Sequence, residues 1–435
     1  MTFPHSVVTA TGFWLSVVAG SLMLTPRTVV AEWTIGDPIV TYWAGPGYDG
    51  MVPLTDAVAR QMVELGINLV WTGTAAEVDL AGRHGLRALY QNRSILLPKY
   101  LDDPALRSQI DVTVKELRGK PALYAYHIVD EPPATRFEEL GRLVAYLREQ
   151  DPDHLSRINL FPSNVEPPTM GAPDYSTYLN DFCRIVRPSL LSYDFYQFHT
   201  TYDHPTYLES LGIIATKAKT MSVPFMSFVQ ASKWAPDIRV PNGNEVRYLV
   251  YTTLAHGAQG IGYYVWWWPN HEGGIVDSQG KPTAIYDTLK AVNREFVAIA
   301  RQSRKWKPIG PFLKGYRPGK LPPGTTALPS HSSFDIQSIP NDQTFHYGVN
   351  YGQPLRGVLF GFFGKNSSTL KDATAAVVVN LDYSVGKTYT IKGPGNLSVF
   401  NATTGEWRAA WQDSVTVDLP PGGGVLVGLT SAAPY

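Results

Sequence analysis

The sequence predicts the α/β fold class, with a (β/α)8 TIM barrel followed by a small all-β sandwich domain. From about residue 37 to residue 303, short apolar runs rich in β-formers alternate with longer segments of helical period, which is typical of parallel strands joined by helices. After Arg304 the helical period stops, and Gly- and Pro-rich turns separate short alternating strands. At 435 residues, the chain is long enough for one large core and one smaller core.

Eight strands are expected in the barrel, with helices between them. The strand runs are 39–45, 67–73, 86–92, 123–132, 156–163, 190–198, 224–232 and 260–268. Segments of helical period include 55–65, 101–117, 137–150, 175–186, 208–220, 244–256 and 283–301. Eight such units in roughly 270 residues match the usual size of a closed barrel. An open doubly wound sheet is the alternative, but AGPGYDG after the first run is not the Gly-rich phosphate turn that often marks it.

Three segments follow from these patterns: a signal peptide at 1–31, the barrel at 32–310 and the C-terminal β-sandwich domain at 311–435. The apolar run 13–24 is too short to span a bilayer comfortably, and the small residues that end at Ala31 suit signal-peptidase cleavage. We therefore expect a secreted or periplasmic protein that has no membrane association after cleavage. An uncleaved membrane anchor is the alternative.

Charge balance and aromatic content narrow the class of partner. Lys plus Arg and Asp plus Glu both number 37, so there is no electrostatic argument for nucleic acid or an anionic membrane. The 11 Trp and 24 Tyr suit a carbohydrate partner, because sugars stack their CH faces on aromatic rings, although such rings also fill barrel cores. Cys183 is the single cysteine, which excludes an intrachain disulfide. The sequence does not indicate an oligomeric state.

Polar and aromatic residues end nearly all of the strand runs. The C-terminal ends of barrel strands meet on one face, and barrel enzymes place their chemistry there. We therefore expect these residues to line one site. They are Trp43, Trp71, Asn92, Asp130, Glu131, Asn159, Asp194, Tyr196, Gln230, Trp266 and Trp268, with His127 lower on the fourth strand.

The fourth strand run ends abruptly in Asp130-Glu131-Pro132-Pro133. Proline cannot continue a strand ladder, so both carboxyl groups should stand at the mouth of the barrel. Because side chains alternate along a strand, only one of the two acids can point inward unless the strand exit bends. With Glu131 central, Asp130 would flank it and orient it, raise its pKa or contact the substrate. The alternative is an exposed acidic turn without function.

Asp194, at the end of the sixth run, is the best second acid within a strand. Carboxyl pairs about 5–5.5 Å apart give retention of the anomeric configuration in sugar hydrolysis, and pairs about 6.5–9.5 Å apart give inversion. Strands four and six lie two positions apart, at roughly 9–10 Å between backbones, so the spacing leaves the mechanism open. The alternative role of Asp194 is a hydrogen bond to a barrel neighbour or a substrate hydroxyl. The seventh run ends in Gln230, which cannot be a carboxylate nucleophile.

The remaining residues of the predicted site would bind the substrate. At least one tryptophan of the eighth strand should floor a sugar subsite, with Trp43 and Trp71 as further candidates, although core packing is the alternative for each. No metal or cofactor is predicted, since His127, His199 and His256 have no metal-ligand spacing. The sequence also contains no phosphate loop and no Gly-x-Ser-x-Gly elbow.

With these residues in view, the chain resembles the barrel glycoside hydrolases. Asp130-Glu131-Pro132 is similar to the Asn-Glu-Pro of the clan that includes families 5 and 42, which implies that Glu131 is the proton donor. The nucleophile of that clan is a glutamate that ends the seventh strand, where this chain has Gln230. The Asp-Glu pair is also similar to that of the hexosaminidases of families 20 and 123. In those enzymes the aspartate orients the 2-acetamido group of the substrate, which attacks the anomeric carbon.

Two further segments carry a resemblance. Ser192-Tyr193-Asp194 resembles the Tyr-Asp on the sixth strand of family 18 chitinases, and the C-terminal segment is similar to the β-domains that close many such hydrolases. Together with the predicted signal peptide, these likenesses imply a secreted glycoside hydrolase that cleaves O-glycosidic bonds of an oligo- or polysaccharide, with Glu131 as general acid and Asp130 and Asp194 as orienting, stabilising or nucleophilic acids. The alternative is a non-catalytic carbohydrate-binding barrel.

Overall fold

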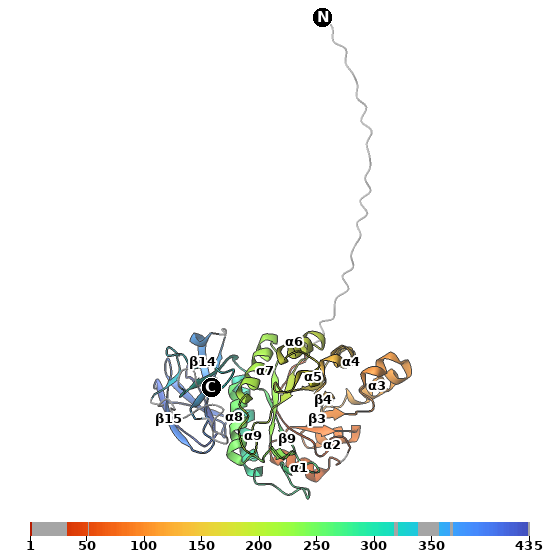
Figure 1. Ribbon diagram of the computed structural model, residues 1–435, viewed down its shortest axis with the longest axis horizontal. Coiled ribbons are helices and arrows are strands. Elements are labelled where there is room, and N and C mark those ends of the chain that lie inside the picture. The colour runs from red at the N-terminus through yellow and green to blue at the C-terminus, as the bar shows by residue number, and fades with distance from the viewer. Residues whose placement is uncertain (2–32, 51, 317–320, 338–355, 366–368, 434–435) are drawn as a thin grey trace. The chain divides into compact units, whose positions relative to one another are not determined.

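The computed structural model describes residue 1 and residues 33–50, 52–316, 321–337, 356–365 and 369–433. Its larger part is a parallel eight-stranded sheet surrounded by helices (Figure 1). The strand order is β1-β9-β7-β6-β5-β4-β3-β2, so neighbours in sequence are neighbours in space around the sheet. The predicted (β/α)8 barrel followed by an all-β domain is confirmed.

The eight barrel strands fall within the predicted runs or within one residue of them. They are β1 (Ile39–Trp43), β2 (Leu69–Thr72), β3 (Arg87–Gln91), β4 (Leu123–Asp130), β5 (Leu155–Leu160), β6 (Leu191–Asp194), β7 (Phe225–Gln230) and β9 (Gly260–Tyr264). In the sequence, the short strand β8 (Ser232–Lys233) comes between β7 and β9. It pairs with β10 (Glu272–Gly273) rather than with the barrel.

Several helices begin where a polar side chain accepts hydrogen bonds from their first turn. Thr74 caps α2 and Asp174 caps α6 in this way, while Asn242 and Glu245 form a complete capping box on α8. The helices are α1 (Asp56–Glu64), α2 (Ala75–Arg83), α3 (Pro104–Leu117), α4 (Phe137–Gln150), α5 (Pro167–Met170), α6 (Tyr175–Ile185), α7 (Tyr207–Met221), α8 (Gly243–Ala255) and α9 (Tyr286–Ser303).

Large side chains fill the barrel interior opposite glycines of β9. The Phe228 ring of β7 lies beside Gly262, where a Cβ atom would come within 2.3 Å of the ring. Gly260 makes room for Met226 in the same way, since a Cβ there would lie 2.7 Å from the Met226 Cβ. The interior is therefore a packed core in which one strand supplies space for its neighbour, as in other barrels of this size.

The barrel closes between β1 and β2 through side chains rather than through a regular ladder. The Asn68 backbone N–H donates to Val40 O at 3.0 Å, and its side-chain Oδ1 accepts from Val40 N at 3.0 Å. The Asn68 Nδ2 donates to Pro38 O, and the Trp71 Nε1 donates to Tyr42 O at 2.6 Å. One asparagine amide and one indole thus satisfy backbone groups that strand pairing would otherwise satisfy.

The C-terminal domain consists of two antiparallel sheets. The first sheet contains β11 (Lys307–Lys314), β13 (Val358–Gly364), β14 (Ala373–Asn380), β19 (Gly424–Leu429), β16 (Leu397–Asn401) and β17 (Glu406–Ala409) in that order. The second contains β12 (Asp335–Ile336), β15 (Lys387–Lys392) and β18 (Ser414–Leu419).

Both faces of β14 are buried, which explains its unbroken apolar sequence. Ala376 and Val378 belong to the core of the β-domain, whereas Val377 and Val379 belong to the barrel core on the side of α8. Glycines allow this close contact: a Cβ on Gly361 of β13 would lie 1.9 Å from Ala255 O at the end of α8. The Tyr383 hydroxyl donates to the Asp203 carboxylate in the loop after β6. The β-domain therefore supports the side of the barrel that carries Asp194.

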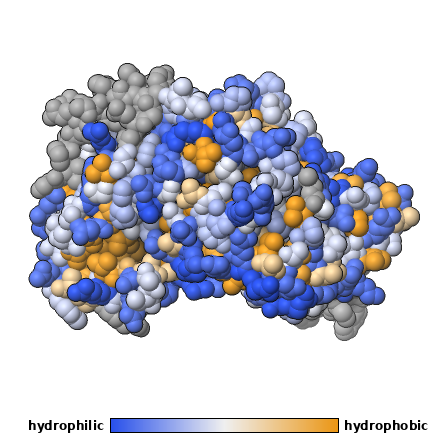
Figure 2. All heavy atoms as spheres, turned by 90° about the horizontal axis from the view of Figure 1, so that it is seen from below, coloured by the Kyte–Doolittle hydropathy of each residue, from blue (hydrophilic) through white to orange (hydrophobic). Residues whose placement is uncertain are grey.

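Figure 2 shows one face of the molecule, on which hydrophilic residues predominate. Its largest hydrophobic group lies at the lower left, on the side of the C-terminal domain. Among the described residues, no helix has both the length and the apolar character needed to cross a bilayer. The predicted signal peptide at 1–31 lies outside the described residues apart from Met1, and the boundary between 310 and 311 stays a prediction.

Replacing Gly262 with alanine should destabilise the protein, because the new methyl group would overlap the Phe228 ring in a packed core. We expect Gly262→Ala to lower the free energy of unfolding by about 1–3 kcal/mol. The matched control is Gly212→Ala on α7, where a Cβ meets no atom within 4 Å. That variant should gain roughly 0.5–1 kcal/mol from reduced backbone freedom. Thermal unfolding of the two variants measures both effects, and equal melting temperatures would contradict the described packing.

Candidate active site

Both acids of the fourth strand reach the mouth of the barrel because the strand is irregular there. His127 pairs with Arg157 and Val129 with Ile158, so Ile128 is an extra residue in β4. This bulge shifts the alternation by one position and puts Asp130 on the interior face with His127. Glu131 then adopts a left-handed backbone conformation with φ of 44°, while its N–H still donates to Asn159 O at 2.9 Å. The strand exit therefore bends, which is the condition for both acids to face the site.

A single asparagine joins Asp130 to Asp194. The Asn159 Nδ2 donates to Asp130 Oδ1 at 3.1 Å and to Asp194 Oδ1 at 2.8 Å. Asn159 and Asp194 are buried. The Asp130 side chain is accessible to solvent, but many protein atoms lie around its carboxyl group, as expected for a residue at the rim of a cleft. The two aspartates, at the ends of β4 and β6, are thus held on either side of one amide of β5, the strand between them.

Burial raises the pKa values of all three carboxyl groups, and repulsion by neighbouring carboxylates adds to the rise for Glu131 and Asp194. Desolvation is the main cause for Glu131, and the charges of Asp194 and Asp130 raise its pKa further above the ordinary value. Desolvation also raises the pKa of Asp194, but hydrogen bonds from Asn159 and Tyr196 oppose the rise. The pKa of Asp130 is raised by burial and lowered by Asn159, Arg157 and Arg93. Glu131 is the carboxyl group for which only raising effects act, so it is the one that retains its proton most readily.

A buried arginine lies below the acids. Arg157 is 2% exposed, and its guanidinium carbon lies 4.9 Å from the Phe228 ring centre and 5.2 Å from that of Trp43. Burial lowers the pKa of Arg157 to about 10, so the group keeps its charge at neutral pH. Arg157 Nη1 lies 3.3 Å from His127 Nδ1, and burial holds the pKa of His127 well below its ordinary value. A neutral His127 therefore accepts this hydrogen bond at Nδ1.

Aromatic side chains line the mouth on the side of Asp194. The Tyr196 ring lies 4.5 Å from the ring of Trp234 and 5.2 Å from that of Tyr264. The Tyr264 hydroxyl lies 3.1 Å from His271 Nε2, and Trp234 and His271 have nearly parallel rings. Tyr196 was expected at the site from the sequence. Trp234 and His271 were not, because they lie in the loops after the barrel strands β7 and β9, where the sequence has no strand pattern.

A second aromatic group surrounds Arg157. Trp43, Trp71 and His127 meet edge to face with ring centres 4.9–5.5 Å apart, and all three are buried. Tyr48 packs on Trp71 and on the half-buried Trp268, and its hydroxyl accepts from Arg93 Nη2 at 2.7 Å. Trp268 is therefore the rim tryptophan of this group, while Trp43 and Trp71 form its floor.

Three other residues of the predicted site have structural contacts. Gln230 is fully buried and makes three backbone hydrogen bonds, two to Phe198 and one to Arg239. Trp266 is 3% exposed and packs on Tyr42 beneath the mouth. Asn92 is half-buried, and its Oδ1 accepts from Ser94 N in the turn after β3. In this conformation Gln230 and Trp266 support the site from below, and their predicted sugar contacts stay predictions.

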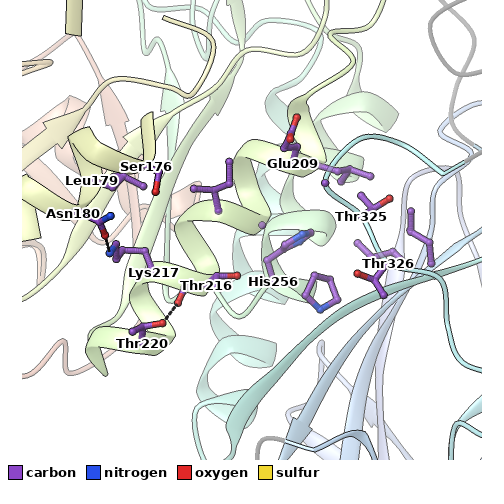
Figure 3. Close-up of a pocket in the computed structure, with 17 residues that line it drawn as sticks. Ser176, Leu179, Asn180, Glu209, Thr216, Lys217, Thr220, His256, Thr325 and Thr326 are labelled. Carbon is purple, nitrogen blue, oxygen red and sulfur yellow. Dashed lines mark hydrogen bonds between the residues drawn. The ribbon is translucent and has the colours of Figure 1, made fainter. Parts of the chain in front are cut away.

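Two cavities of about 450 and 570 Å³ lie outside the barrel and not at the acids. The first lies between α6, α7 and the C-terminal domain and is lined by residues that include Glu209, Thr216, Lys217 and Thr326 (Figure 3). The second lies at the other end of α7, and His256 lines both. None of the three carboxyl groups lines either cavity, so these two cavities are not the candidate site.

The described residues contain no group of three or more His, Cys, Asp or Glu side chains placed to hold a metal ion. Although Asp130, Glu131 and Asp194 affect one another electrostatically, the polar partner between the two aspartates is the Asn159 amide rather than a cation. The arrangement can hold a proton on one carboxyl group beside two others that are more readily ionised. Such a set suits general acid catalysis with a neighbouring anion.

No protein-family model matches this chain. No curated protein matches it either. Among solved structures, the chain is similar to a family 42 β-galactosidase from G. stearothermophilus, with 10% identity, a TM-score of 0.56 and coverage of 90% of this chain and 98% of that one.

Two other structures illustrate weaker likenesses. The endo-β-1,4-mannanase from Thermotoga petrophila has 10% identity and a TM-score of 0.42 over 88% of this chain and 97% of that one. The β-galactosidase from Marinomonas ef1 has 11% identity and a TM-score of 0.42, and the match spans 57% of each chain. At these identities a likeness concerns the fold. The resemblance to barrel glycoside hydrolases is therefore confirmed at the level of the fold, through the family 42 structure.

Proposed function

We propose that the protein hydrolyses an O-glycosidic bond of a carbohydrate, with Glu131 as the general acid. The observation that carries this proposal is the convergence of Asp130, Glu131 and Asp194 at the mouth of an aromatic-lined barrel, with the pKa of Glu131 raised by burial and by both neighbours. A carboxylic acid that stays protonated near neutral pH can protonate a leaving oxygen, and the two aspartates can stabilise the positive charge that develops on the sugar. The shared fold with a family 42 β-galactosidase agrees with this class of reaction.

The attacking group in this proposal does not come from the seventh strand. Gln230 stands there with its amide engaged by backbone groups, so a covalent intermediate on that strand is not part of the proposed reaction. Three routes remain: direct attack by the Asp194 carboxylate, which forms a covalent intermediate and retains the anomeric configuration, attack by water activated by Asp194, or attack by a 2-acetamido group of the substrate that Asp130 or Asp194 orients. Water attack inverts the anomeric configuration, whereas substrate assistance retains it.

The aromatic residues supply the proposed sugar contacts. Tyr196, Trp234 and Tyr264 lie beside Asp194, and Trp268 lies on the other side of the mouth beside Tyr48. Export to the periplasm or the medium, where an oligo- or polysaccharide would be met, is part of the proposal and depends on the segment 1–31.

One observation favours a second candidate function, a carbohydrate-binding barrel without turnover. The position that supplies a carboxylate in the resembling clan holds Gln230. Binding of glycans with no product from any of a broad panel of glycosides would support this second function over hydrolysis.

Replacing Glu131 with glutamine should reduce kcat/KM at least ~100-fold on a substrate with a poor leaving group, because the proton donor is lost. The reduction should be much smaller for an aryl glycoside with a very acidic phenol, since that leaving group departs without protonation. Glu138→Gln on the exposed face of α4 is the matched control and should behave as wild type. Steady-state kinetics on the two kinds of substrate provide the measurement, and an unchanged rate for Glu131→Gln would exclude Glu131 as the acid.

Replacing Asp194 with asparagine should shift the basic limb of the pH profile. Glu131 must be protonated to act, and the charge of Asp194 raises its pKa. Without that charge, the pKa of Glu131 falls, so the loss of activity at high pH should begin at a lower pH than in wild type. The residual rate on a glycoside with a poor leaving group gives the profile, because cleavage of that substrate depends on the proton of Glu131. Asp181→Asn, on the outer surface of α6, is the control and should leave the limb in place. An unshifted limb in Asp194→Asn would contradict the electrostatic effect of Asp194 on the pKa of Glu131.

A further inference from the structure

A hydrogen-bond chain runs from the buried arginine to the two aspartates. Arg157 Nη2 donates to Ser192 Oγ at 3.0 Å, and Ser192 Oγ donates to Asn159 Oδ1 at 2.8 Å. The Asn159 Nδ2 then donates to Asp130 and Asp194. Arg157, Ser192 and Asn159 are each 2% exposed or less, so their hydrogen-bonding groups depend on one another rather than on bulk water.

The direction of this chain follows from the number of protons that each group carries. A guanidinium has donors and no acceptor, so Ser192 Oγ must accept from Arg157. A serine hydroxyl has one proton, which remains available for Asn159. Only the amide oxygen of Asn159 can accept that proton, which turns the amide NH2 toward the carboxyl groups. A positive charge at one end thus fixes the orientation of the amide at the other.

We propose that Arg157, Ser192 and Asn159 act as positioning residues, which lock the Asn159 amide so that its two N–H groups keep Asp130 and Asp194 in place and favour their ionised forms. This inference deepens the proposed function and rests on it. The donated hydrogen bonds favour the charged forms of both aspartates. Glu131 receives no side-chain hydrogen bond from the described residues and is left as the carboxyl group that carries the proton.

Other ionisable groups face these carboxyl groups from the neighbouring elements. The tyrosines near Asp194 have raised pKa values and stay neutral over the working range, so Arg157 and Arg93 are the cations of the group. These surrounding groups are Tyr48 and Arg93 in the loops after β1 and β3, His127 and Glu131 of β4, Arg157 of β5, Tyr175 and Tyr178 of α6, Tyr193 of β6, Tyr196 after β6 and Tyr264 of β9.

Ser192→Ala tests the chain, because it removes the proton that holds the amide without touching either aspartate. With the amide free to turn, the pKa values of Asp130 and Asp194 should rise, and the acidic limb of kcat/KM should move up by about one pH unit. Ser227→Ala, at a buried serine of β7 outside the chain, is the matched control and should keep the wild-type limb. Asn159→Asp, which has nearly the same shape but no donor, should shift the limb at least as far as Ser192→Ala.

An activity-independent readout separates this inference from the proposed function. In protein labelled with 13C at the aspartate carboxyl carbon, the Asp194 and Asp130 signals, assigned by their loss in Asp194→Asn and Asp130→Asn, should titrate at higher pH in Ser192→Ala than in wild type. Unmoved signals in a folded variant would overturn the chain, even if glycosides are hydrolysed. A moved signal with no turnover of any glycoside would instead support the chain and contradict the hydrolase.

If Ser192→Ala and Asn159→Asp both fail to fold, the wild-type protein still tests the inference. With 15N on asparagine side chains, one NH2 pair must change its shift over the same pH range as the Asp194 carboxyl carbon. The absence of any such pair would overturn the inference.

Discussion

Three carboxyl groups share one poorly solvated mouth above a single buried cation, and the rest of the site follows from this constraint. Ionising Asp130, Glu131 and Asp194 together is unfavourable, because each negative charge raises the free energy of ionising the next. Arg157 attracts Asp130 and Asp194, and the Asn159 amide stabilises the same two groups by hydrogen bonds. The third, Glu131, keeps a proton because no such donor reaches it within the described part of the chain. The division of roles between acid and anions is thus a result of where the few available donors point.

This arrangement is unfavourable for folding at neutral pH. A carboxyl group whose pKa is higher in the folded than in the unfolded protein holds its proton after the unfolded chain has released one, so stability falls as pH rises through that interval. Asp194 and Glu131 are both of this kind. The left-handed backbone at Glu131 adds local strain of about 1–2 kcal/mol. Packing elsewhere offsets these costs, in the filled barrel interior and where β14 is buried against α8 on one side and the second sheet on the other.

The C-terminal domain has a direct physical connection to the site. Asp203 follows β6 by a short loop, accepts a hydrogen bond from Tyr383 of the β-domain, and faces Arg239 at 3.5 Å. Arg239 in turn donates Nη1 and Nη2 to the buried Glu245 at the start of α8. The loop that carries Tyr196 is therefore anchored from two elements, and the barrel core itself continues onto one face of β14 through Val377 and Val379.

Periodicity and turn chemistry predicted the fold because they are local. The eight strand runs, the capped helices and the switch to an all-β segment after Arg304 are each encoded within a few residues. Helix α2 is short, contains a glycine and did not stand out as a helical segment. The site was predicted in part: the acids of β4 and β6 lie together, but the bulge at Ile128 depends on pairing with β5 and is not visible in the sequence.

Other parts of the site could not be predicted for the same physical reason. Arg157 looks like an ordinary charged residue of an alternating strand, and only the neighbouring strands make it a buried cation. Trp266 and Gln230 stand at strand ends, but contacts with residues distant in the sequence bury both side chains, Trp266 on Tyr42 and Gln230 against the backbone of Phe198 and Arg239. A signal for Arg157 did exist in the sequence, since its position two residues before Asn159 puts both side chains on one face of β5.

The central claim, that Glu131 holds its proton where ordinary glutamates have lost theirs, has one direct test. In wild-type protein labelled with 13C at the glutamate carboxyl carbon, the Glu131 signal can be assigned by its absence in Glu131→Gln and followed against pH. We expect it to titrate far above the ordinary glutamate range of about 4.3 and to remain in the protonated position through pH 6. Titration within the ordinary range would contradict the account.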